Sequence, residues 1–180
     1  MKILQIHLGE LSDERKECVQ SVRRAYPECD YEMITDTGEH VSEMMRDLGM
    51  KIIPRRFDIT HPKGCVVISD WLRFLICSNE DCLYLDTDVI VHKRFDDFSF
   101  KDKPYLLAVH SSGVLDYCVI YGNGCRDWFI DRLKARIENP NVLIGSYCHL
   151  DAYPIPMEYM THIGPSSKRD EHWQDKHWSW

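Results

Sequence analysis

The sequence lacks the features that mark several large classes of protein. No run of about 18 apolar residues occurs, so we expect no segment to span a membrane. Basic residues are not in excess, since 22 Lys and Arg stand against 29 Asp and Glu. The resulting net charge of −7 argues against a nucleic-acid partner, which needs a basic surface. No internal repeat or low-complexity tract is present, and 180 residues are enough for one globular domain.

The eight cysteines form no Cys-x-x-Cys pair and show no regular spacing. Cys77, Cys82 and Cys118 lie in apolar segments, so we expect them to be small buried hydrophobic residues. This usage favours a reducing intracellular environment over a disulfide scaffold. The apolar stretch between Met1 and His7 is too short for a signal peptide, and a cytoplasmic location is therefore expected.

Apolar periodicity, caps and breakers predict alternating strands and helices. The expected strands cover residues 2–7, 31–34, 82–91, 105–109 and 117–121. The expected helices cover residues 12–26, capped by Ser12 and stopped by Pro27, then 41–48, stopped by Gly49, then 65–78 and 126–138. Residues 52–63 read as a surface loop, and an irregular tail rich in Pro, His and Trp follows the last helix. The alternation predicts an α/β fold with a mostly parallel sheet flanked by helices.

An Asp-x-Asp motif interrupts the most apolar strand, Cys82-Leu83-Tyr84-Leu85-Asp86-Thr87-Asp88-Val89-Ile90-Val91. Carboxylates at a buried strand end are costly unless a cation or hydrogen bonds offset their desolvation. Ligands of parallel sheets gather at the carboxyl ends of the strands, where Asp86 and Asp88 fall. Oxygen ligands suit Mg²⁺ or Mn²⁺, which bind carboxylates together with substrate phosphates. The alternative is a strand-end turn in which Asp86 caps backbone N–H groups and Asp88 is solvated.

Three stretches together resemble the GT-A glycosyltransferases, and specifically the family of capsular-polysaccharide and mannosyl-type sugar transferases. They are Ser21-Val22-Arg23-Arg24-Ala25-Tyr26-Pro27 running to Ile34-Thr35-Asp36, then Ser69-Asp70-Trp71-Leu72-Arg73 followed by Tyr84-Leu85-Asp86-Thr87-Asp88, and finally Thr161-His162-Ile163-Gly164-Pro165-Ser166-Ser167. The resemblance implies a single GT-A-like (Rossmann-like) domain over residues 1–167 and a Trp- and His-rich tail over 168–180. It also implies Mn²⁺- or Mg²⁺-dependent transfer of a sugar from a UDP- or GDP-sugar to a carbohydrate acceptor, in glycan synthesis.

The resemblance further implies roles for single residues. Asp86 and Asp88 would hold the metal ion and contact the diphosphate and ribose, and His162 would be the ligand from the C-terminal segment. Asp70 and Arg73 would meet the donor sugar and diphosphate. Because these two lie three apart on one helical face, the alternative for them is a local ion pair without a catalytic role.

Further candidates complete the predicted site. Lys168 follows His162 by six residues, as does a diphosphate-binding Lys in a related transferase family. His7, at the end of the first strand, could approach the nucleotide base, although a strand-end histidine with local partners is the commoner case. An inverting enzyme would also need a carboxylate base near the acceptor hydroxyl, for which Asp116 and Asp151 are the candidates.

Two other functions fit parts of the sequence. An apolar strand ending in Asp-x-Asp-x-Ile is close to the nucleophile motif of haloacid-dehalogenase-like phosphatases. That motif normally opens its domain, whereas 85 residues precede Asp86 here. The chain could instead be a non-catalytic module that binds sugar nucleotides or carbohydrate.

Overall fold

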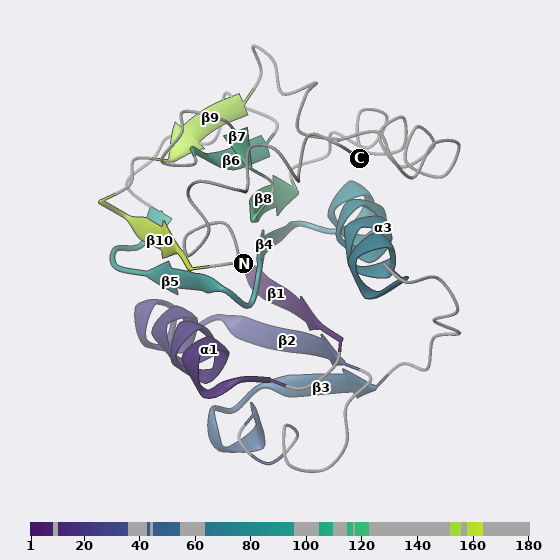
Figure 1. The fold of residues 1–180 in the computed structure, drawn as a ribbon, viewed down its shortest axis with the longest axis vertical. Helices are drawn as coiled ribbons and strands as arrows, with labels where there is room; N and C mark the ends of the chain where they lie inside the picture. The colour runs from purple at the N-terminus through teal and green to yellow at the C-terminus, as the bar shows by residue number, and fades with distance from the viewer. Residues whose placement is uncertain are drawn as a thin grey trace, which may run out of the picture.

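The fold is built on a five-stranded sheet with the strand order β3-β2-β1-β4-β8 (Figure 1). The computed structural model describes residues 1–8, 11–35, 43, 45–54, 64–95, 105–109, 115–116, 118–122, 152–155 and 158–163. The strands β1 (Lys2–His7), β2 (Asp30–Thr35), β3 (Lys51–Pro54) and β4 (Cys82–Leu85) are parallel, and β8 (Val119–Gly122) pairs antiparallel with β4. The prediction of a mostly parallel α/β sheet is confirmed.

Two helices cover opposite faces of this sheet, α1 (Asp13–Ala25) and α3 (Gly64–Asn79) (Figure 1). Alternate residues of each strand face opposite sides, so β1 contributes Ile3 to the core under α1 and Leu4 to the core under α3. In β4, Leu83 and Tyr84 divide in the same way. The sheet is therefore buried on both faces, which explains why β4 reads as a continuous apolar run and why β1 carries apolar residues on both faces.

The ends of the helical segments follow from local hydrogen bonds. Ser12 is the N-cap of α1, and its Oγ accepts a hydrogen bond from the backbone N–H of Arg15 at 3.4 Å. Residues 45–47 are helical and end at Gly49, which has a φ of 67°. The N–H of Gly49 donates to Arg46 O at 2.8 Å and that of Met50 to Met45 O at 2.9 Å. This pair of bonds is a Schellman motif, so the predicted stop at Gly49 is confirmed.

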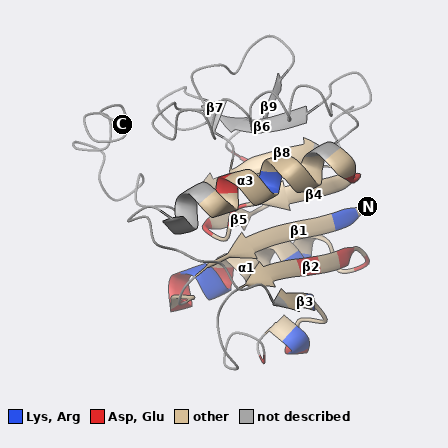
Figure 2. Ribbon diagram, turned by 90° about the vertical axis from the view of Figure 1, so that its right-hand side faces the viewer, with Lys and Arg blue, Asp and Glu red and all other residues tan. Residues whose placement is uncertain are grey.

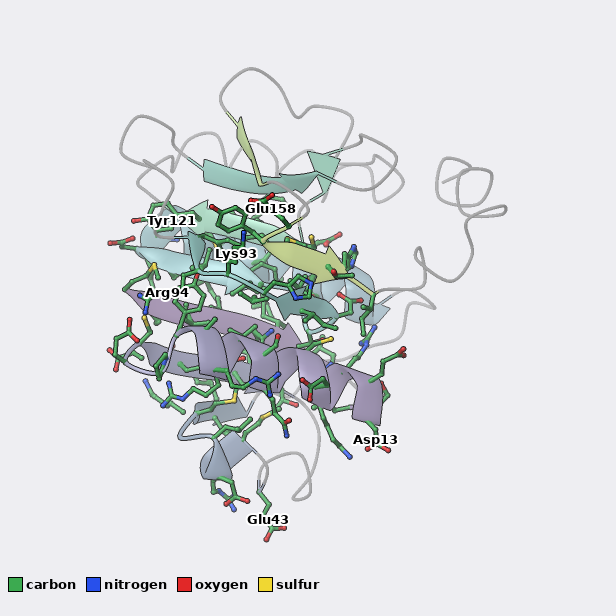
Figure 3. The ribbon with its side chains drawn as sticks, turned by 90° about the vertical axis from the view of Figure 1, so that its left-hand side faces the viewer. Asp13, Glu43, Lys93, Arg94, Tyr121 and Glu158 are labelled. Carbon is green, nitrogen blue, oxygen red and sulfur yellow. The ribbon has the colours of Figure 1, made fainter. Side chains whose placement is uncertain are left out.

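Two smaller sheets complete the described part of the chain. The strands β5 (Val89–Val91) and β10 (Met160–His162) pair antiparallel. Beside them, β6 (Tyr105–Val109) lies between β7 (Leu115–Asp116) and β9 (Ala152–Ile155). Ser21 Oγ of α1 accepts a hydrogen bond from the N–H of Val91 at 2.9 Å, which docks β5 on the helix. Next to this pair, Lys93 Nζ lies 3.4 Å from Glu158 (Figure 3).

Several predicted elements match the structure, and others do not. The strands over 2–7 and 105–109 are confirmed, and α1 and α3 differ from their predicted bounds by one residue at each end. The loop assigned to residues 52–63 is wrong at its start, because residues 51–54 pair with β2 as the edge strand β3. The irregular tail is wrong at β9 and β10, which are strands. The helix predicted over 126–138 and the tail 168–180 lie outside the described residues.

Two predictions about burial and membrane spans can be compared with the described residues. Cys77, Cys82 and Cys118 are fully buried, as expected, and they are free thiols. No helix within the described ranges has the length and apolar character needed to cross a membrane.

Candidate functional site

The candidate site lies where the order of the sheet reverses. From β1 the chain runs through α1 to β2 on one side, whereas α3 leads back to β4 on the other side of β1. Ligands of α/β sheets bind outside the carboxyl ends of the strands at such a switch point. His7 ends β1 and Asp86 directly follows β4, so both lie at this position.

Asp86, Asp88 and His162 converge there as a candidate metal site. Their ligand atoms all lie within 4.8 Å of one another, and His162 Nε2 is 3.1 Å from Asp88 Oδ1. The β5–β10 pair brings His162 opposite Val89, and the N–H of Ile163 donates to Asp88 O at 2.8 Å. Ligands bound at about 2.1 Å to one octahedral ion are roughly 3 Å apart when adjacent and about 4 Å when opposite. Small side-chain rotations would therefore bring all three donors onto a single divalent ion.

The Asp86 side chain is partly buried at the end of β4. Its backbone N–H donates to Cys118 O at 2.7 Å, and its carboxylate accepts a hydrogen bond from Tyr84 Oη. Burial raises the pKa of the Asp86 carboxyl to about 6, although the neighbouring Arg73 guanidinium acts to lower it. This carboxyl therefore ionises at a higher pH than an ordinary Asp, and a divalent ion would compete with its proton.

Arg73 links the predicted residue Asp70 to Asp86. Its Nη2 lies 2.8 Å from Asp70 Oδ1 and its Nη1 lies 3.2 Å from Asp86 Oδ1, and only 9% of its side chain is exposed. The guanidinium carbon also lies 4.9 Å from the centre of the Tyr84 ring. Asp70 and Arg73 are the charged residues of α3, visible as its red and blue segments in Figure 2. The ion pair within α3 is therefore present, and it extends to the Asp-x-Asp motif.

Asp88 has a cationic neighbour that the sequence reasoning missed. Arg15 Nη2 lies 3.4 Å from Asp88 Oδ2, while His162 approaches the other oxygen. The Asp88 side chain is 14% exposed, so it is not the solvated turn residue of the alternative reading. No sequence signal marks Arg15, because Asp13 and Glu14 already place negative charge in the first turn of α1 and Arg15 reads as one more solvated charge.

The loop that carries the two acids is held by side chains of β1. Gln5 Nε2 donates to Asp86 O at 3.1 Å, and Gln5 Oε1 accepts from Tyr31 Oη of β2. His7 Nδ1 lies 3.2 Å from Thr87 Oγ1. Gln5 was also missed. Residues two positions apart in a strand point to the same face of the sheet, so Gln5 and His7 could have been expected on one side of β1. His7 thus stands beside the motif, and contact with a nucleotide base stays a prediction.

Of the remaining predicted site residues, the structure describes only the backbone of Asp116. Asp116 ends β7, where its backbone pairs with Ala108 of β6. Asp151 and Lys168 lie outside the described residues. The roles suggested for these three stay predictions.

Comparison with known proteins gives similarity of structure only. No protein family and no curated protein matches the sequence. The solved structure of the active-site mutant Q189E of LgtC is 14% identical over 87% of this chain and 73% of its own, with a TM-score of 0.60. The PaToxG glycosyltransferase is 16% identical over 97% of this chain and 69% of its own, with a TM-score of 0.61.

A third similar structure is that of an enzyme with a different activity. The nucleoside-diphosphate-sugar pyrophosphorylase from Vibrio cholerae is 11% identical over 94% of this chain and 98% of its own, with a TM-score of 0.57. At these identities the similarity defines the fold alone. The chain has the α/β fold of GT-A glycosyltransferases, with a mostly parallel central sheet flanked by helices.

Proposed function

We propose that this chain is a metal-dependent glycosyltransferase that moves a sugar from a nucleotide-diphosphate sugar to an acceptor hydroxyl, in glycan or polysaccharide synthesis. The observation that carries the proposal is the convergence of Asp86, Asp88 and His162 at the switch point of the sheet. Similar structures support it, since LgtC is a galactosyltransferase solved with donor and acceptor sugar analogs. The donor, a UDP- or GDP-sugar, is part of the proposal.

The donor set fits Mn²⁺, with Mg²⁺ as the alternative. Carboxylate oxygens suit both ions, and an imidazole nitrogen favours the transition metal over Mg²⁺. When bound, such an ion supplies Lewis-acid stabilisation of the negative charge on the departing diphosphate. Asp86 and Asp88 would hold it together with His162, leaving further positions for phosphate oxygens. An acidic chain of net charge −7 needs such a cation to bind an anionic donor.

We assign Asp70 and Arg73 to the support of this site and to the donor side of it. Arg73 contacts both Asp70 and Asp86, so its guanidinium fixes the orientation of the Asp86 carboxylate and favours its charged form. Asp70 in turn fixes the guanidinium from the previous turn of α3. Asp70 is then positioned beside the metal site, where it can accept a hydrogen bond from a sugar hydroxyl.

The alternative functions are less well supported. In a phosphatase of the haloacid-dehalogenase type, Asp86 would be the nucleophile. Here Tyr84 donates a hydrogen bond to that carboxylate and Arg73 pairs with it, and both contacts reduce its nucleophilicity. A non-catalytic module would share the whole site, so only turnover separates it from an enzyme.

The test is release of nucleotide diphosphate from UDP- and GDP-sugars in the presence of Mn²⁺ and without an acceptor. Release that stops with a chelator and in Asp88→Asn supports the proposal. Donor binding without any release, with or without a panel of sugar acceptors, would assign a binding module. Hydrolysis of p-nitrophenyl phosphate would assign the phosphatase, and formation of nucleoside triphosphate from donor and pyrophosphate would assign a pyrophosphorylase.

A further inference from the structure

Arg15 is the more accessible of the two arginines that contact the acidic motif. Its side chain is 35% exposed and meets one carboxylate, whereas Arg73 is almost fully enclosed between Asp70 and Asp86. We propose that Arg15 binds the diphosphate of the nucleotide, and that Asp88 holds its guanidinium until the nucleotide and a divalent ion bind. This inference rests on the proposed function and adds a binding residue to it.

The neighbours of Arg15 on α1 have other partners. Asp13, labelled at the start of the helix in Figure 3, lies 2.6 Å from Lys16 Nζ. Arg24 pairs with Glu17, and Arg23 Nη1 donates to Cys29 O at 2.9 Å. Arg15 alone among these basic side chains contacts the candidate site.

The contact between Arg15 and Asp88 is suited to exchange. At 3.4 Å it is longer than the roughly 2.7–2.9 Å of a strong charge-assisted hydrogen bond. The other oxygen, Asp88 Oδ1, lies 3.1 Å from His162 Nε2, a separation that adjacent ligands of one ion would have. If Asp88 Oδ1 and His162 held an ion, Arg15 would stay at Asp88 Oδ2. It would then lie near a diphosphate that binds to the same ion. A guanidinium matches phosphate geometry with two parallel N–H donors.

The arrangement gives Arg15 opposite effects on the two ligands. Before the nucleotide binds, its positive charge competes with the divalent ion for the charge of Asp88 and weakens binding of the ion alone. Once the ion is bound, the same charge attracts a diphosphate. A residue with a purely structural role would not change the two affinities in opposite directions.

The test uses inorganic pyrophosphate as a probe that does not depend on the base. Calorimetry on the full chain measures Mn²⁺ alone, then pyrophosphate in saturating Mn²⁺, for the wild type, Arg15→Gln and Arg15→Lys. We expect Arg15→Gln to bind Mn²⁺ about tenfold more tightly and pyrophosphate about tenfold more weakly, each a change of about 1.4 kcal/mol. Arg15→Lys keeps the charge but lacks the fork, so its Mn²⁺ affinity should match the wild type while its pyrophosphate affinity is intermediate.

Lys16→Gln is the matched control. It removes a positive charge from the residue next to Arg15, and the side chain of Lys16 is paired with Asp13. It should change neither affinity. Unchanged pyrophosphate binding in Arg15→Gln would overturn the inference while leaving the proposed function intact. Weaker binding of both ligands would also overturn it, since Arg15 would then serve to orient Asp88. Opposite shifts in a chain that transfers no sugar would support the inference and refute the proposed function.

Discussion

Arg73 offers a test of how the site is held together. The substitution Arg73→Met keeps an unbranched side chain but removes the guanidinium that lies over Tyr84 and between Asp70 and Asp86. Taking one partner from a buried ion pair costs about 3–5 kcal/mol, and the two carboxylates here keep some exposure. We therefore expect a loss of about 3 kcal/mol in the free energy of unfolding at pH 7.5, or roughly 6–12 °C in Tm for a chain of this size.

The loss should depend on pH in a defined direction. With Arg73 present, the pKa of Asp86 is about 6, and removing the guanidinium raises it further. At pH 5 the carboxyl of the variant is therefore protonated and neutral, and it no longer needs a cation. The destabilisation should accordingly be smaller at pH 5 than at pH 7.5.

Urea unfolding at both pH values, followed by circular dichroism, measures the effect. The control is Arg24→Met on α1, which breaks an exposed pair with Glu17 and should change stability little. Arg73→Lys should fall between the wild type and Arg73→Met, because an ammonium cannot bond both carboxylates with the fork geometry. Equal stability of Arg73→Met and the wild type at pH 7.5 would refute the role assigned to Arg73.

Three further predictions concern the metal site and its support. If the ion contributes about 4 kcal/mol to transition-state stabilisation, Asp88→Asn should lower turnover roughly 10³-fold. Asp86→Asn should have the next largest effect on turnover and His162→Ala the smallest. Near-wild-type turnover in Asp88→Asn would contradict the metal site. Because the pKa of Asp86 is raised to about 6, its protonated form favours the folded state at low pH, and this contribution is lost as pH rises through 6. Mn²⁺ needs the deprotonated form, so the increase that it causes in the urea midpoint should be larger at pH 7.5 than at pH 5, and equal increases would show that Asp86 is not a ligand. Gln5→Leu removes the hydrogen bonds that Gln5 makes to Asp86 O and Tyr31 Oη, and should lower the free energy of unfolding by about 1–3 kcal/mol. It should also weaken Mn²⁺ binding measured by calorimetry. Unchanged Mn²⁺ affinity would show that Gln5 does not position the loop.

The parts of the fold that were predictable from sequence have local causes. The strand β1 reads directly from its mainly apolar residues, and α1 begins at Asp13 because the Oγ of Ser12 caps the first turn. Gly49 ends its helix because a left-handed φ follows the last turn. In each case the residues that determine the structure lie within about five positions of it, so a single sequence is sufficient.

The strands that were missed depend on partners far away in the chain. The residues of β3 are few and include Pro54, and they form a strand because β2 offers a free parallel edge. The three residues of β10 pair with β5, and this pairing spans about 70 residues of sequence. No local pattern distinguishes such short segments from loop, since their stability comes from the partner strand.

The candidate site divides along the same line. Its acids were predictable because Asp86 and Asp88 interrupt an apolar segment, where unpaired carboxylates are costly to bury and so indicate a binding partner. The groups that neutralise or orient them come from other elements. Arg73 of α3 and His162 of β10 were named from the family resemblance, whereas Arg15 of α1 and Gln5 of β1 were missed. A cation on an amphipathic helix looks like any solvated charge until the topology places it beside an acid. Residue patterns alone therefore identified the acids of this site, whereas its cationic and orienting groups needed the family resemblance or the structure.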